Sequence, residues 1–204
     1  MSLNKLFNPK RIMSKTLWYL LVIDIIIGTG FGLIAPIFAI FLKDNLVGGS
    51  IISAGIASAI FLITKCIVQL PFSKYIDKQE KKIKWLLIGT IIISIAPIIY
   101  IFANHIYWIY VSELIYGIGA GIEYPVWMSI WTRNLDKRRE AFQWSVYSTS
   151  VSFAVGIAGL VGAIFASVIG FTFTFMILEL FCLVSIVGIY KLYLFEKKGH
   201  IKYH

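Results

Sequence analysis

Long apolar stretches alternate along the chain with short polar connections. A helix needs about 20 mostly apolar residues to cross a bilayer, and each of these stretches reaches that length. The pattern predicts six membrane-spanning helices, over residues 17–42, 51–73, 83–103, 106–131, 142–169 and 171–194. No polar linker divides them, so residues 1–204 are expected to form a single six-helix bundle of the all-α membrane class.

The polar connections differ in charge in a regular way. Lysine and arginine are concentrated before the first predicted helix, in the second and fourth connections and in the tail. The remaining connections contain one basic residue, Lys43. Basic residues mark cytoplasmic loops, so we expect an integral protein of the cell (plasma) membrane with both termini in the cytoplasm. An even number of helices is required for this alternation.

The overall composition agrees with a membrane protein. Hydrophobic residues make up 59% of the chain and charged residues 14%, whereas soluble chains carry about 25% charged residues. The net charge of +9 predicts contact with anionic lipid headgroups and requires no nucleic-acid partner. The lipid bilayer is therefore the first expected partner.

The residues that usually carry catalysis or bind metals are sparse. Cys66 and Cys182 lie inside apolar stretches, and the three histidines lie in loops and at the end of the chain. This distribution predicts no disulfide framework, metal site, cofactor or enzymatic nucleophile–base pair.

Two of the predicted helices share a pattern of an acid, three glycines and a proline. The first copy is Asp24-x3-Gly28-x-Gly30-x-Gly32-Leu33-x2-Pro36, and the second is Glu113-x3-Gly117-x-Gly119-x-Gly121-Ile122-x2-Pro125. The first and fourth helices cross in opposite directions, so the pattern predicts an inverted repeat of three helices plus three. Paired helices interrupted by glycine and proline indicate a transport site. The alternative is that the glycines only allow close packing and the prolines only kink the helices.

Three further motifs resemble those of one transporter family. They are Ser73-x3-Asp77-Lys78-x-Glu80-Lys81-Lys82, then Glu113-x3-Gly117-x-Gly119, and then Ala158-Gly159-Leu160-Val161-Gly162-Ala163 followed by Gly170-Phe171 and Phe175. Together they resemble the N-terminal six-helix half of a major facilitator superfamily (MFS) transporter. Ser73 and Glu80 replace family glycines, and Glu113 replaces a family arginine. The third motif lacks the proline associated with antiporters.

The resemblance implies alternating access, in which two six-helix bundles rock around a central site. One bundle supplies half of this pathway, so the expected partner is a second copy in a homodimer or a partner half on another chain. The resemblance also implies a cytoplasmic gate formed by Asp77, Lys78, Arg133 and Arg139. For Asp77 the alternative is a solvated loop charge.

Five acids and lysines lie deep inside the predicted helices, away from their ends, where charge is costly and usually functional or paired: Asp24, Lys65, Glu113, Glu123 and Glu179. Asp24, Lys65 and Glu123 lie roughly 10 Å from the cytoplasmic boundary, and the other two lie about as deep from the outer boundary. The inner group is expected to hold an ion pair between Lys65 and an acid. The outer group would be two like charges, of which one carboxyl is protonated.

Each ionisable group has a functional and a structural interpretation. Glu123, Asp24 or Glu113 would take up the proton that couples to solute movement, or Lys65 would only neutralise an acid and fix helix packing. Glu179 would face an oligomer contact. The carboxylates suit a cationic or protonatable small solute, and the aromatic residues Phe31, Tyr124 and Trp127 are expected to line the cavity. The alternative function is a non-transporting scaffold, an accessory subunit or a truncated carrier.

Overall fold

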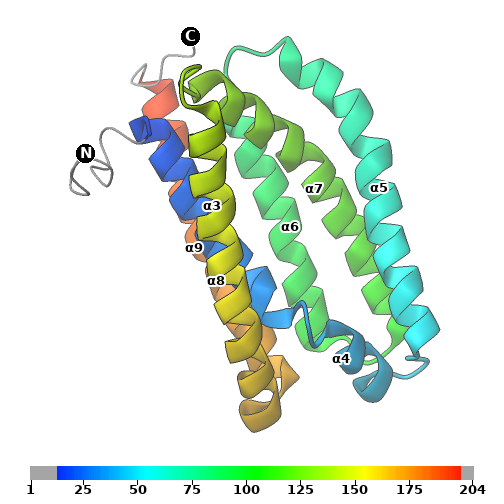
Figure 1. The fold of residues 1–204 in the computed structure, drawn as a ribbon. Coiled ribbons are helices and arrows are strands. Elements are labelled where there is room, and N and C mark those ends of the chain that lie inside the picture. The colour runs from blue at the N-terminus through cyan, green and yellow to red at the C-terminus, as the bar shows by residue number, and fades with distance from the viewer. Residues whose placement is uncertain (1–12, 199–204) are drawn as a thin grey trace, which may run out of the picture.

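The structure is a computed structural model that describes residues 13–198. Within that range the chain forms seven α-helices and no strand (Figure 1). The helices are α3 (Lys15–Ile34), α4 (Phe38–Asn45), α5 (Ile51–Asp77), α6 (Ile83–Phe102), α7 (Ile106–Asn134), α8 (Glu140–Ile169) and α9 (Phe171–Lys197). The basic residues Lys5, Lys10, Arg11 and Lys202 and the histidines His200 and His204 lie outside the described residues.

Five of the described helices are long and apolar enough to cross a membrane: α3, α5, α6, α8 and α9. The sequence of α7 is less apolar, because Glu113, Glu123 and several tyrosines and glycines interrupt its 29 residues. This helix nevertheless runs beside α5 and α6 for its length (Figure 1).

The first predicted span, over residues 17–42, is broken into α3 and α4 at residues 35–37. Pro36 has no backbone N–H to donate to the carbonyl four residues earlier, so the helix cannot continue regularly through it. The Ala35 N–H still bonds to the Phe31 carbonyl, and the Ile37 N–H bonds to Ile34. The second matched proline, Pro125, lies inside the unbroken α7, so the interruption expected there is absent.

Most of the predicted spans are shorter than the helices that contain them. The predicted segments 51–73, 106–131 and 171–194 continue to Asp77, Asn134 and Lys197. Each extension adds one turn that contains polar residues. The backbone hydrogen bonds of the helix continue through this turn, but the predicted span ends where the apolar stretch ends.

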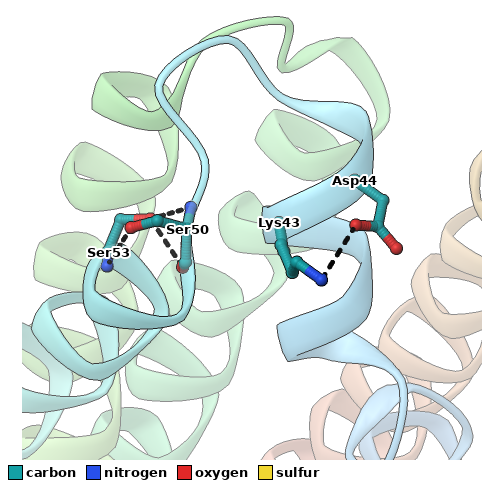
Figure 2. Close-up of polar contacts among 4 residues, drawn as sticks. All are labelled: Lys43, Asp44, Ser50 and Ser53. Carbon is teal, nitrogen blue, oxygen red and sulfur yellow. Dashed lines mark hydrogen bonds and ion pairs between the residues drawn. The ribbon is translucent and has the colours of Figure 1, made fainter.

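The connection from α4 to α5 is stabilised by local polar contacts (Figure 2). The Ser53 N–H bonds to the Ser50 hydroxyl at 3.0 Å, and the Ser50 N–H bonds to the Ser53 hydroxyl at 2.6 Å, a capping box that starts α5. Lys43 and Asp44 form an exposed ion pair of 3.9 Å, which contributes little to stability. The tight turn between α8 and α9 contains Gly170, whose φ of 86° lets α9 begin directly after α8.

The start of α3, the α5–α6 and α7–α8 connections and the end of α9 all lie at one end of the bundle (Figure 1). Nearly all lysines and arginines of the described residues lie at this basic end, and the opposite end carries only Lys43. One hydrophobic core lies at the basic end around Leu17, Leu86 and Trp131, and a second lies at the opposite end around Leu42 and Phe175.

The helices pack in two groups. Helix α7 packs against α5 and α6, α3 packs against α8 and α9, and α6 contacts α9 (Figure 1). The glycines of the repeated pattern follow this division: Gly28 and Gly32 face α8, and Gly30 faces α9.

The second set of glycines makes corresponding contacts: Gly117 and Gly121 face α5, and Gly119 faces α6. A Cβ at five of these six positions would lie within 3.1 Å of the facing helix; Gly28, at 3.5 Å, has more room. The glycines therefore allow close helix packing, as one of the two interpretations of the repeat expected.

Candidate functional site

A hollow of about 250 Å³ lies between α3, α5, α6 and α7. Its wall includes Gly28 and the side chains of Phe31, Lys65, Glu123 and Tyr124, all of which the sequence singled out. Their side chains come from three helices that the close-packing glycines bring together. The hollow thus combines an acid, a base and aromatic surface within the apolar part of the bundle.

Glu123 is held in place by α6. Its backbone passes against Gly89, where a Cβ would approach the Glu123 Cβ to 2.8 Å, so a larger residue would displace this carboxyl. The Thr90 hydroxyl oxygen lies 3.0 Å from Glu123 Oε1 and 3.0 Å from the Leu86 carbonyl oxygen.

The Thr90 hydroxyl has a single proton for these two neighbours. An ionised Glu123 can only accept this proton. A protonated Glu123 can instead donate to the hydroxyl oxygen, while Thr90 donates to Leu86. The contact therefore accommodates both protonation states of the carboxyl without moving the helices.

Lys65 does not form the expected ion pair in the part of the chain that the structure describes. Its ammonium lies 4.6 Å from the centre of the Tyr124 ring, a cation–π contact, and interacts with Glu123 only over a longer distance. The cation is therefore oriented by an aromatic face, and the Glu123 carboxyl stays open to the hollow.

Tyr116 forms an aromatic stack in the wall of the hollow. Its ring lies 4.9 Å from Phe31 and 4.3 Å from Phe61, between α3 and α5. It precedes Glu123 by two helical turns, about 10 Å along α7 in the direction away from the basic end. All three rings line the hollow, so the stack forms part of its wall.

Asp24 lies outside the wall of the hollow. It interacts electrostatically with Glu123, and the Tyr147 hydroxyl of α8 lies next to its carboxyl. Trp127 is likewise not in the wall of the hollow: it is buried, stacked on Trp131 at 5.1 Å, and 4.9 Å from the Tyr147 ring.

The two outer acids are separate. Glu113 is buried and accepts a hydrogen bond of 2.6 Å from the Tyr100 hydroxyl. Glu179 is half-buried on α9, and its Oε2 has no hydrogen-bond partner among the described residues. Neither carboxyl acts electrostatically on the other, and no hydrogen bond joins them among the described residues, so the expected pair of like charges is not formed.

Tyr100→Phe is expected to lower the free energy of unfolding by about 1–2 kcal/mol, because it leaves the buried Glu113 carboxyl without its donor. Unfolding in detergent, followed by circular dichroism, measures the change. Tyr107→Phe is the matched control, because it removes the same hydroxyl from a tyrosine that is 68% exposed at the start of α7, the helix that carries Glu113. Equal stability of the two variants would contradict the structural role of this hydrogen bond.

Two of the predicted gate residues share a groove of about 460 Å³ at the basic end. Asp77 at the end of α5 and Arg133 near the end of α7 both line it, although no ion pair joins them in the described part of the chain. Lys78 follows α5 as an exposed residue, and Arg139 precedes α8 outside the groove.

Lys82 is a buried cation at the basic end of the bundle. It is fully buried, and its ammonium donates to the Ser129 hydroxyl at 2.7 Å. Burial lowers the pKa of Lys82 from 10.5, the nearby Arg133 lowers it further, and Asp77 opposes both. Lys82 therefore links the α5–α6 connection to α7.

Glu196 at the end of α9 fixes the start of α6. Its Oε1 accepts hydrogen bonds from the Lys82 N–H at 3.0 Å and the Ile83 N–H at 3.4 Å. Helix N-termini have unpaired N–H groups that favour a carboxylate. Sequence reasoning named Lys82 only as a basic position of the loop motif, and it missed Glu196, Tyr100 and Tyr116. Each looks like an ordinary loop or helix residue until its partner helix is known.

No group of three or more potential metal ligands occurs among residues 13–198.

The family model described as Major Facilitator Superfamily matches residues 20–203. Multidrug resistance protein 2 of Bacillus subtilis (strain 168) is 26% identical over 145 residues, which are 70% of this chain and 36% of that protein.

Two solved transporters share the fold. The in meso crystal structure of the POT family transporter PepTSo has a TM-score of 0.73 at 17% identity, covering 90% of this chain and 37% of that chain. The crystal structure of an auto-inhibited POT family peptide transporter has a TM-score of 0.71 at 15% identity, covering 87% of this chain and 37% of that chain. The chain thus spans little more than a third of the length of these relatives.

Proposed function

The chain belongs to the major facilitator superfamily, and from this premise we propose that it forms part of a proton-coupled transporter that moves a small solute by alternating access. The observation that carries the proposal is the hollow in which Glu123 and Lys65 lie beside aromatic walls. An acid and a lysine inside the apolar part of the bundle are costly, and they have no role in apolar packing. The Thr90 contact supports Glu123 as the proton carrier, because it suits both of its states.

We propose six spans, with α3 and α4 together as the first and α7 as the fourth. The grouping of basic residues at one end of the bundle supports an orientation in the cytoplasmic membrane with both termini in the cytoplasm. The proposed inverted repeat pairs α3 with α7, α5 with α8 and α6 with α9. If each helix is replaced by its partner in these pairs, the glycine contacts of α3 with α8 and α9 become those of α7 with α5 and α6. This correspondence supports the repeat.

A second bundle is needed to close the solute pathway. We propose a second copy of this chain, or a partner half, seated against α5 and α8. These two helices are the least buried of the candidate spans and carry exposed apolar side chains such as Ile63, Ile67, Leu160 and Ile164. Closed two-fold pairs are the commonest oligomers, which favours the homodimer.

Cys66 provides a direct test of the homodimer. It is an exposed cysteine on α5, one residue from Lys65, whereas Cys182 is buried. A membrane-permeant bismaleimide is expected to link two chains through Cys66, because an α5–α5 contact places the two thiols within reach. Cys66→Ser should abolish the linked dimer on denaturing gels, and Cys182→Ser should not. An unlinked wild-type chain would contradict a contact between the α5 helices of two copies.

The relatives named for multidrug resistance and for peptide transport differ in the solutes that their names state. An acid beside aromatic walls suits an amphipathic cation best, and we propose this class of solute. The test is uptake of a fluorescent organic cation, and of a panel of neutral and anionic solutes, by proteoliposomes containing the purified chain.

Uptake that depends on an imposed pH gradient supports the proposal. If the reconstituted chain takes up no member of the panel, the result favours the scaffold or accessory-subunit alternative. Preference for an anionic solute would contradict the proposed solute class but not transport itself.

A further inference from the structure

A second, larger groove lies on the outside of the bundle at the basic end, between α3 and α9. Its volume is about 800 Å³, and its walls include Trp18, Tyr19, Val22, Ile26, Val184 and Val187. Lys15 and Lys191, both exposed, also line it. The hollow around Glu123 shares none of these residues, so the groove has no part in the proposed solute pathway.

We propose that this groove binds an anionic phospholipid from the leaflet at the basic end. The apolar walls would hold an acyl chain, and the two lysines would hold the phosphate-bearing headgroup.

The dimensions of the groove match one leaflet. From Lys15 to Ile26 the wall follows α3 for about 16 Å, and half of the hydrocarbon core of a bilayer is about 15 Å thick. Gly188 lies at the side facing Ile23, where an added Cβ would lie 3.2 Å from the Ile23 Cγ1. The absence of a side chain at Gly188 lets the two helices converge at this point.

The charges select the lipid class. Basic pockets between membrane helices on the cytoplasmic side bind acidic headgroups, and a lysine near the surface favours an anionic lipid about fivefold. The described lining of the groove contains two lysines and no acid. Trp18 and Tyr19 occupy the level at which aromatic side chains contact headgroups.

The groove is tested by quenching of tryptophan fluorescence with brominated lipids in reconstituted vesicles. The difference between the wild-type chain and Trp18→Phe isolates the signal of Trp18 from the other tryptophans. Brominated phosphatidylglycerol is expected to quench Trp18 at several-fold lower mole fraction than brominated phosphatidylcholine does.

The double variant Lys15→Gln with Lys191→Gln should remove this preference. The control is Lys74→Gln with Lys81→Gln, which removes the same charge from exposed positions at the basic end, away from the groove, and should keep the preference. Equal quenching by both lipids, or equal loss in both double variants, would overturn the proposal. Absence of quenching by either lipid would also overturn it, because the groove would then be covered by protein.

Discussion

Glu123→Gln is expected to reduce uptake driven by a pH gradient to the level of protein-free liposomes. The amide can still donate to the Thr90 hydroxyl, so it reproduces the contact of the protonated acid. It cannot release a proton, and the step that depends on this release is therefore lost. Uptake by proteoliposomes, with equal amounts of inserted protein, measures the effect.

Two comparisons make this result specific. Glu140→Gln changes the same functional group at an exposed position in the first turn of α8, and it should transport as the wild-type chain does. Counterflow of labelled solute without a pH gradient should survive in Glu123→Gln, because solute exchange needs no net proton movement. Gradient-driven uptake that persists in Glu123→Gln would remove this residue from the coupling mechanism.

Gly162→Ala is expected to destabilise the bundle by about 3 kcal/mol, at the upper end of the usual cost of overpacking. A Cβ at this position of α8 would overlap the backbone carbonyl of Leu33, next to the break before Pro36. A backbone atom cannot rotate away as a flexible side chain does, so α3 and α8 would have to separate. Unfolding in mixed detergent micelles measures the change.

Gly156→Ala is the matched control on the same helix. A Cβ at Gly156 meets no atom within 4 Å, so alanine should be neutral or stabilise the helix by up to about 1 kcal/mol. Equal destabilisation of both variants would show that the contact with Leu33 does not determine the effect. A second measurement, protease sensitivity of the folded variants, detects separation of α3 from α8 directly.

The resemblance to the major facilitator superfamily seen in the sequence is confirmed by the family match over residues 20–203. The motifs that carried it were all incomplete, yet their order along the chain was sufficient. The helical fold and the membrane location could also be predicted from the sequence, because both depend on the length of the apolar stretches and on the composition. These are local properties that require no knowledge of neighbouring helices.

The side-chain partners could not be predicted in the same way. Lys65 contacts the Tyr124 ring instead of an acid, and Glu113 is bonded to Tyr100 instead of lying beside Glu179. In each case depth along the membrane was predicted from residue counts, but the rotation of the helix about its axis was not. Rotation determines which neighbour a side chain meets.

The sequence by itself determined that this chain is an apolar helical protein of a transporter family, with two glycine patterns repeated at a constant offset. The tertiary structure decided what those patterns do. The glycines pack α3 and α7 against their neighbours, Pro36 alone among the prolines of residues 13–198 breaks a helix, and Glu196 fixes the start of α6 from more than 100 residues away. The physical reason is that helix formation is satisfied by hydrogen bonds within one segment. Close packing and buried polar contacts require two segments to meet.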